Sequence, residues 1–180
     1  ILALLSSPSF NPNLFTSGIS KKKYNALLTS TEKPLFNRAI AGQYPPGSTV
    51  KPLFGLIGLT TNKITPRTTI QDTGLFFIEG VDRAWREPKK GGHGSFVDLD
   101  QAITESCDVF FYRLGFQVGI DILADMSERF GLGRKTDIDL PGEAPGIMPT
   151  REWKIENRGS QWFDGDTLNA SICLLYTSPS

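Results

Sequence analysis

The chain has 180 residues, of which 39% are hydrophobic, and this is enough apolar material to bury one core. Its 19 basic and 19 acidic residues balance, so bulk charge gives no reason to expect a nucleic-acid or anionic-membrane partner. No apolar run approaches the roughly 20 residues that span a bilayer, and the start of the chain lacks the charged region of a signal peptide.

The first third of the chain predicts a strand followed by two helices. Residues 1–8 form a short apolar run typical of a strand, and residues 19–31 are polar with a helical composition. The best-defined helix runs from residue 48 to about 61, because the turn residues 45–47 (Pro-Pro-Gly) lead into an apolar-periodic segment. Pro52 falls in its first turn, where the missing N–H costs little.

The middle of the chain predicts short strands and then a broken helix. Residues 62–97 are rich in Gly, Pro, Thr and charge, which indicates an extended insert with short strands. Residues 98–119 predict two helical pieces with a break near Ser106, and either Asp98 or Asp100 is positioned to cap the first piece.

The last third predicts two more helices around a turn-rich segment. Apolar spacing favours a helix over residues 120–130, with Gly131 as its C-cap. Residues 137–146 form a turn cluster, and a helix is expected to begin within residues 148–154, capped by Thr150.

Both ends of the sequence indicate a fragment. The chain begins without Met inside an expected strand, and residues 173–180 (CLLYTSPS) resemble the translation of a sequencing-library adapter. We therefore expect a partial domain over residues 1–172 and an artefactual tail over residues 173–180. With Cys173 set aside, Cys107 is the one remaining cysteine, so no internal disulfide is expected.

A Ser-x-x-Lys pattern is the first candidate for chemistry. It occurs three times, at Ser20/Lys23, Ser30/Lys33 and Ser48/Lys51. A lysine that works as a base near neutral pH needs a pKa about 3 units below its usual ~10.4, and desolvation against an apolar helix supplies such a shift. Only the third pair is followed by an apolar helix, so Ser48 is the predicted nucleophile and Lys51 its base. The alternative is a helix cap beside a surface lysine.

A second hydroxyl and a carboxylate stand at the predicted helix break. Ser106 and Asp108 lie two residues apart, directly before the apolar run VFFY. A hydroxyl there could relay a proton to a leaving amine, while Asp108 or its neighbours orient substrate. The alternative is that Ser106 caps the helix and Asp108 occupies its first turn.

Four segments together carry a family resemblance. They are ILALLSSPSFNPNLF, NRAIAGQYPPGSTVKP, ESCDVFFYRLG and GIMPTREWK. In order and spacing they resemble the transpeptidase domain of the class B penicillin-binding proteins, in particular the penicillin-binding protein 2 branch. The resemblance extends to about residue 172. It implies the serine acyltransferase fold shared with β-lactamases, an α/β fold of the α+β type in which helices flank an antiparallel sheet.

The resemblance assigns roles to the four residues. Ser48 would be the acyl-forming nucleophile, Lys51 its base, and Ser106 with Asp108 the second motif; Asp rather than Asn at the last position favours the penicillin-binding protein 2 branch. The implied reaction is peptidoglycan D,D-transpeptidation, the cross-linking of stem peptides that end in D-Ala-D-Ala during cell-wall elongation. The enzyme would be a target of β-lactam antibiotics.

The resemblance also implies a cellular setting. The catalytic domain would be periplasmic, held at the bacterial inner membrane by an upstream helix outside this chain, beside a membrane glycosyltransferase of the elongation machinery. Two rivals stay open. One is a hydrolase of the same fold, a β-lactamase or carboxypeptidase, and the other is a β-lactam-binding sensor or non-catalytic elongation component.

One motif of the family is missing. The third motif, Lys-Ser/Thr-Gly on a sheet strand, is absent, and Lys135-Thr136-Asp137 is a decoy because it lacks the glycine and precedes a turn. The fold is therefore expected to be truncated before the third-motif strand. We expect the fragment by itself to be inactive.

A metal site is the last candidate. His93, Cys107, Asp72 and Glu87 make an acceptable tetrahedral zinc set, although their spacing matches no local zinc motif. The resemblance implies a structural zinc near the active site bound by two Asp, a His and a Cys, with Glu87 standing where Asp is expected. No cofactor is required for the chemistry itself. The alternative is a solvated His93 and a small buried Cys107.

Overall fold

The structure is a computed structural model that describes residues 1–173. The chain divides into two units, which are described separately. Unit 1 comprises residues 1–43 and 133–147, and unit 2 comprises residues 44–132 and the part of the chain from residue 148 onward.

Unit 1 consists of short helices joined by extended segments. Its elements are the 3-10 helix η1 (Pro12–Phe15) and the helices α1 (Lys21–Leu28) and α2 (Arg38–Ala41). Each begins at a polar cap, namely Asn11, Ser20 and Asn37 in turn, whose side chain accepts a backbone N–H of the first turn. Helix α1 confirms the helical prediction for residues 19–31.

The strand predicted for residues 1–8 is wrong. This segment is irregular, and most of its side chains, including Leu2 and Leu5, are exposed. A strand is held by a hydrogen-bonded neighbour, and no described segment pairs with this one. Its apolar composition alone did not indicate whether a partner exists.

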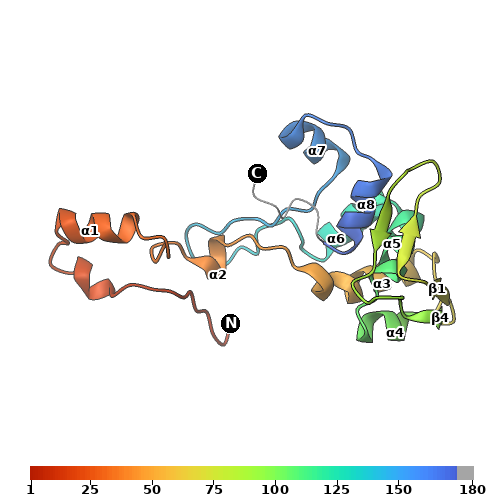
Figure 1. The fold of residues 1–180 in the computed structure, drawn as a ribbon. Helices are drawn as coiled ribbons and strands as arrows, with labels where there is room; N and C mark the ends of the chain where they lie inside the picture. Colours follow the sequence, from red (N-terminus) through yellow and green to blue (C-terminus); the bar gives the residue numbers. More distant parts are fainter. Residues whose placement is uncertain (174–180) are drawn as a thin grey trace. The chain divides into compact units, whose positions relative to one another are not determined.

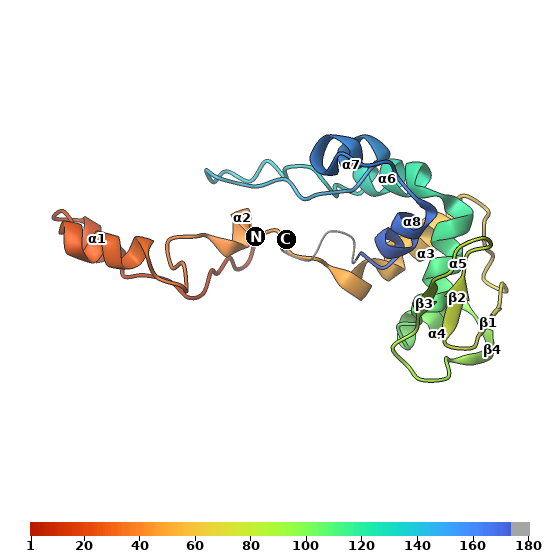
Figure 2. The same ribbon diagram turned by 45° about the horizontal axis from the view of Figure 1, so that its top comes forward.

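Unit 2 carries eleven of the described elements. They are η2 (Gly47–Val50), α3 (Lys51–Thr60), β1 (Ile70–Asp72), β2 (Leu75–Phe77), β3 (Ala84–Arg86), β4 (Gly94–Val97), α4 (Leu99–Thr104), α5 (Asp108–Val118), α6 (Ile120–Arg129), α7 (Arg151–Arg158) and α8 (Asp164–Ser171). Helix α5 lies at the centre and packs against α3, α4, α6, α8 and three of the strands (Figures 1 and 2). The predicted helix from residue 48 is confirmed, with a first turn of 3-10 geometry.

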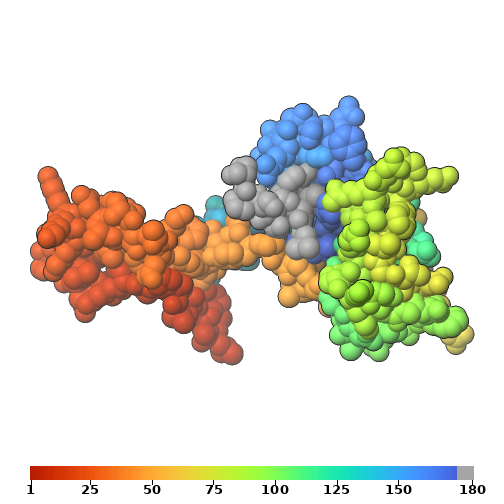
Figure 3. Space-filling model, in the orientation of Figure 1, coloured from red at the N-terminus to blue at the C-terminus, as the bar shows by residue number. Residues whose placement is uncertain are grey.

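The strands form two small antiparallel sheets. β1 pairs with β4, placing Ile70 opposite Val97 and Asp72 opposite Gly94, with a register shift between these pairs. β2 pairs with β3, with Phe76 opposite Trp85. The extended insert predicted for residues 62–97 is thus confirmed, and Figure 3 shows this segment in yellow-green as a continuous surface on one face of unit 2.

Local signals set the helix boundaries in unit 2. Asp98, rather than Asp100, caps α4 by accepting the N–H of Gln101 at 2.9 Å. Thr150 caps α7, as predicted, and Gly131 follows α6 in the left-handed conformation (φ +90°) that glycine adopts without strain.

The core forms where α3 crosses α5. Phe54 and Ile57 of α3 are fully buried against Phe110, Phe111 and neighbouring residues. Gly58 permits this approach, because a Cβ there would lie 2.7 Å from a methyl carbon of Leu114 on α5. None of the described helices combines the length and apolarity needed to cross a bilayer.

Candidate functional site

The Ser-x-x-Lys pair Ser48/Lys51 lies at the start of the core helix. Gly47, at φ +57°, turns the chain into η2, which continues directly into α3. Ser48 is exposed, whereas Lys51 one turn later is buried with 1% of its surface accessible. The sequence prediction that this lysine is desolvated by an apolar helix is confirmed by its burial.

The Lys51 ammonium has an acceptor for each of its three protons. Nζ donates to the Ser106 carbonyl at 2.6 Å, to Ser106 Oγ at 3.0 Å and to Asp108 Oδ1 at 2.5 Å. It also lies 5.4 Å from the centre of the Phe111 ring. A buried lysine is tolerated only when its charge is paired and its donors are satisfied, and here both conditions hold.

Ser106 connects this lysine to Ser48. Its Oγ accepts from Lys51 Nζ and donates to Ser48 Oγ at 2.7 Å. The residue adopts φ +58° between α4 and α5, a conformation that costs a non-glycine residue about 1–2 kcal/mol. That backbone geometry delivers both its carbonyl and its hydroxyl to Lys51. The two hydroxyls and the amine therefore form one hydrogen-bonded chain.

The predicted alternative for Ser106, a helix cap, is not what the structure shows. The cap of α5 is Cys107, whose Sγ accepts the N–H of Phe110 at 3.3 Å. Asp108 does occupy the first turn, as that alternative expected, but its carboxylate is directed to Lys51 in a buried ion pair.

A cleft of about 570 Å³ opens over these groups. Its lining residues are Gly47, Ser48, Glu87, Pro88, Lys89, His93, Glu105, Ser106, Asp108 and Ile172. The volume falls in the range of small-molecule sites. The exposed Ser48 hydroxyl is thus accessible to a ligand, while Lys51 is buried away from water.

The other Ser-x-x-Lys pairs have local structural roles in unit 1. Ser20 caps α1 by accepting the N–H of Lys23 at 3.3 Å, and Ser30 accepts the N–H of Glu32.

The segment around Thr136, which resembles the third motif, is a loop in which both the N–H and the hydroxyl of that residue donate to one carboxylate oxygen of Glu143. These contacts explain the residues without catalysis.

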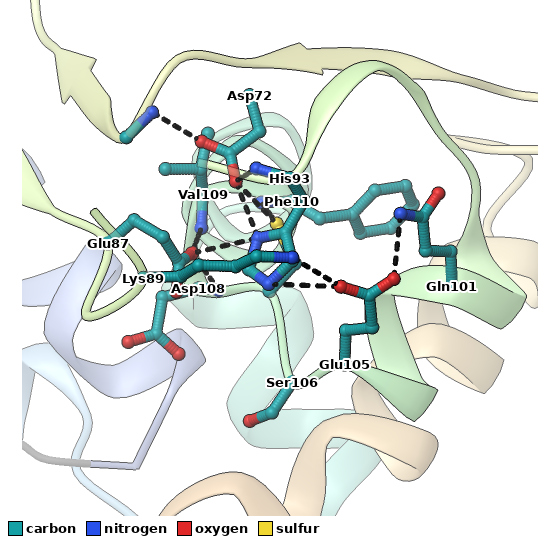
Figure 4. Close-up of polar contacts among 12 residues, drawn as sticks. Asp72, Glu87, Lys89, His93, Gln101, Glu105, Ser106, Asp108, Val109 and Phe110 are labelled. Atoms are coloured by element: carbon teal, nitrogen blue, oxygen red, sulfur yellow. Dashed lines mark hydrogen bonds and ion pairs between the residues drawn. The ribbon is translucent and has the colours of Figure 1, made fainter. Parts of the chain in front are cut away.

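The four predicted metal ligands also come together. Asp72 ends β1, Glu87 follows β3, His93 precedes β4 and Cys107 caps α5, and one donor atom from each lies within 4.8 Å of the others. Asp72 Oδ2 is 2.7 Å from His93 Nδ1 and 3.3 Å from Cys107 Sγ. Figure 4 shows the side chains of Asp72, Glu87 and His93 directed toward one another beside the start of α5.

The electrostatics of this cluster favour a cation. Burial raises the pKa of the Cys107 thiol far above its usual value, and the nearby carboxylates Asp72 and Glu87 raise it further. Burial alone would also raise the pKa of Asp72, but hydrogen bonds from Gly74, His93 and Cys107 together outweigh it and lower the pKa. A metal ion would deprotonate the thiol and neutralise the crowded negative charge.

The donor set fits zinc. One imidazole, one thiol and two carboxylates are all accepted zinc ligands, and tetrahedral geometry needs four donors at short mutual distances. Glu87 reaches the cluster despite standing where Asp is expected, and its Oε2 also accepts the backbone N–H groups of Asp108 and Val109 at 2.7 and 3.2 Å. The longer glutamate arm therefore links the cluster to the first turn of α5.

Two residues of the site were not singled out from the sequence. Glu105 and Lys89 line the cleft and pair with each other at 2.7 Å. The hydrogen bonds from Lys89 and Gln101 lower the pKa of Glu105. Gln101 lies in α4 and Glu105 is its C-cap, and a spacing of four residues along a helix predicts the contact of 3.0 Å between their side chains.

Comparison with known proteins identifies relatives of the whole described chain. Residues 1–179 match the family model of the penicillin binding protein transpeptidase domain. The peptidoglycan D,D-transpeptidases MrdA of Acinetobacter baumannii and Escherichia coli K12 are 47% and 45% identical over 172 residues, which is 96% of this chain. The alignments cover 25% and 27% of those relatives, so the chain spans about a quarter of their length.

Solved structures show the same relationship. A structure of Pseudomonas aeruginosa PBP2 in complex with WCK 5153 is similar with a TM-score of 0.93 and 44% identity, over 98% of this chain and 38% of that one. The complex between PBP2 and MreC from Helicobacter pylori is similar with a TM-score of 0.90 and 39% identity, over 96% of this chain and 32% of that one. A peptidoglycan synthase complex that coordinates polymerization and crosslinking is similar with a TM-score of 0.79 and 33% identity, over 93% of this chain and 28% of that one. The predicted fold class is confirmed.

Proposed function

The chain belongs to the penicillin binding protein transpeptidase domain family, and we propose that it is the nucleophile-bearing part of a peptidoglycan D,D-transpeptidase of cell-wall elongation. Its substrate would be a stem peptide ending in D-Ala-D-Ala, and β-lactams would acylate the same serine. The observation that carries this proposal is the hydrogen-bonded chain from buried Lys51 through Ser106 to exposed Ser48, at the wall of a cleft.

Acylation follows from this chain of contacts. Ser48 Oγ attacks the carbonyl carbon of the penultimate D-Ala, its proton passes to Ser106 Oγ, and the Ser106 proton passes to Lys51 Nζ. To act as this base, Lys51 must first release one of the three protons that it donates in the structure. Asp108 then stabilises the ammonium that forms, through the ion pair seen in the structure. The peptide C–N bond breaks as the leaving nitrogen takes the proton back through Ser106.

Transfer to an acceptor amine reverses the same route. The acceptor nitrogen attacks the ester carbonyl and gives its proton to Ser106 and Lys51. The Ser48 oxygen leaves and is reprotonated along the chain. Each hydroxyl can exchange its donor and acceptor roles by rotation of its O–H bond. The proposed route therefore uses the same oxygen and nitrogen positions in both half-reactions.

The cluster of Asp72, Glu87, His93 and Cys107 would hold a structural zinc ion. When bound, zinc would tie together the chain segments that carry its four ligands and would take no part in the reaction itself. Cys107 lies between Ser106 and Asp108, so fixing its sulfur fixes the backbone that presents both neighbours to Lys51. We propose this as the reason for a metal next to the nucleophile.

The cellular setting is part of the proposal. Relatives act as peptidoglycan D,D-transpeptidases, and similar structures contain PBP2 with MreC and a complex of polymerization and crosslinking. By this analogy the chain would work at the bacterial inner membrane with its catalytic domain in the periplasm, beside a membrane glycosyltransferase.

An acyl-transfer assay tests the activity against its rivals. The chain, extended through a Lys-Ser/Thr-Gly strand, is incubated with a D-Ala-D-Ala donor peptide and an acceptor amine, and the products are identified by mass spectrometry. A transpeptidase gives the cross-linked product, and a hydrolase gives mainly the shortened donor peptide. A sensor binds β-lactam but gives neither product, and this result would reject the proposed activity.

A further inference from the structure

The His93 ring is flanked by acidic groups on both of its nitrogens. Nδ1 lies 2.7 Å from Asp72 Oδ2 and 3.8 Å from Glu87 Oε2, so this nitrogen faces the other members of the metal cluster. Nε2 points the other way and lies 3.8 Å from Glu105 Oε2. Figure 4 shows the ring between these two sides, with Glu105 outside the cluster of four.

Glu105 is itself held in place by two donors. Gln101 Nε2 donates to its Oε1 at 3.0 Å, and Lys89 Nζ donates to its Oε2 at 2.7 Å. Glu105 is the C-cap that follows α4, two positions before Cys107, so one short segment carries both the sulfur ligand and this carboxylate. The His93 side chain is 2% exposed, which leaves few alternative orientations for its ring.

We infer that Glu105 is a positioning residue of the metal centre, which accepts the Nε2–H of His93 and so leaves the Nδ1 lone pair free for the metal. A neutral imidazole has one N–H and one lone pair, so a proton fixed on Nε2 determines that Nδ1 is the ligand. A carboxylate on the outer N–H also orients the ring and raises its basicity. The present Nε2–Oε2 separation of 3.8 Å is longer than a hydrogen bond, so the inference requires Glu105 to approach the ring when the metal is bound.

This inference rests on the zinc site of the proposed function and adds a connection to the cleft. His93, Glu105 and Lys89 all line the cleft beside Ser48, so the contacts that join these three residues lie in the cleft wall. An alternative explanation of the same contacts is a plain surface ion pair between Lys89 and Glu105, which would leave metal binding unchanged.

Zinc affinity is the first test. The affinity of the chain for Zn²⁺ is measured by competition with a chromophoric chelator in 0.5 M NaCl, which screens the general effect of removing a surface charge. We expect Glu105→Ala to weaken zinc binding by about 10- to 100-fold, the usual loss when an outer partner of a ligating histidine is removed. Glu156→Gln, a change at an exposed glutamate of α7, is the control and should leave the affinity unchanged.

The ring nitrogens give a second readout that a merely structural role would not move. His93 is the sole histidine of the chain, so ¹⁵N-labelled imidazole gives one set of signals. In the zinc-loaded chain we expect the proton on Nε2 and the metal on Nδ1. In Glu105→Ala the Nε2 proton signal should shift upfield, because its carboxylate partner is gone, while the unfolding midpoint of the metal-free chain stays the same.

The outcomes separate this inference from the proposed zinc site. Zinc binding through Nε2, or unchanged affinity and unchanged Nε2 proton signal in Glu105→Ala, would overturn the role of Glu105 while leaving the zinc site intact. Failure of the unmodified chain to bind zinc would overturn both. Lys89→Met gives an independent check: it should weaken zinc binding if Lys89 holds Glu105 in place, and a gain in affinity at high salt would contradict that role.

Discussion

Gly92 is the position where a single added methyl group should damage the metal cluster most directly. A Cβ built there would lie 2.4 Å from the Asp72 carbonyl oxygen, 2.5 Å from the Gly74 nitrogen and 2.6 Å from Asp72 Oδ1. Gly74 N–H donates to that same Oδ1 at 2.7 Å, so the clash falls on the turn that holds a metal-ligand carboxylate. Neither backbone atom can move aside by a rotamer change.

Gly91 provides a matched control for Gly92→Ala. Both glycines have positive φ, +85° for Gly91 and +75° for Gly92, but a Cβ on Gly91 meets no atom within 4 Å. The left-handed backbone should cost either alanine variant about 1–2 kcal/mol. Overpacking adds about 1–3 kcal/mol at Gly92 alone, which sets the expected difference between the variants.

Urea unfolding of the metal-free chains measures this difference, and chelator competition measures the zinc affinity of each folded variant. We expect Gly92→Ala to be less stable than Gly91→Ala by about 1–3 kcal/mol and to bind zinc more weakly. Equal stabilities and equal zinc affinities would refute the reasoning, because the clash with Asp72 would then have no consequence.

Three further predictions follow from the contacts of the site. In the chain extended through a Lys-Ser/Thr-Gly strand, Ser106→Ala removes the hydroxyl between Lys51 and Ser48, so acylation by benzylpenicillin, followed by stopped-flow, should slow about 10²- to 10⁴-fold; an unchanged rate would mean that the proton takes another route. Lys51→Met leaves the Asp108 carboxylate buried without its partner and should cost about 3–5 kcal/mol in urea unfolding, whereas a loss below about 1 kcal/mol would show that the ion pair contributes little. Zinc at 100 times its Kd should stabilise the chain by about 2.7 kcal/mol in thermal unfolding, and His93→Ala should remove this gain; equal gains in both chains would place zinc elsewhere.

The sequence predicted which Ser-x-x-Lys pair has a buried lysine because the signals for it are local. The Pro-Pro-Gly turn, the apolar helix after Ser48 and the helix break at Ser106 are each readable within a few residues. The need for a desolvated lysine distinguishes Ser48/Lys51 from the other two Ser-x-x-Lys pairs, and the contacts of Ser20 and Ser30 agree with that choice. The meeting of α3 with the α4–α5 break was implied only by family resemblance, since local spacing carries no information on distant contacts.

Some features that depend on distant partners were not predicted from the sequence. Residues 1–8 have strand composition but no described pairing partner, and composition alone does not indicate a partner. Cys107 took the capping position because the left-handed turn at Ser106 redirects that hydroxyl to Lys51. Glu105 was not predicted as a site residue because its contact with the His93 ring joins positions twelve residues apart in the sequence.

The predicted tail at residues 173–180 falls almost wholly outside the described residues, and only Cys173 belongs to them. The division into a partial domain over residues 1–172 and this tail stays a prediction. The decoy interpretation of the segment around Thr136 agrees with its loop conformation and its contacts with Glu143.

Acylation at Ser48 tests the central claim most directly. The chain, extended through a Lys-Ser/Thr-Gly strand, is mixed with benzylpenicillin and followed by intact mass, with Ser48→Ala and with Ser20→Ala, the same change at a serine that caps α1. We predict one stable penicillin adduct in the unmodified chain and in Ser20→Ala, and none in Ser48→Ala. A folded protein without an adduct, or an adduct that persists in Ser48→Ala, would contradict the account.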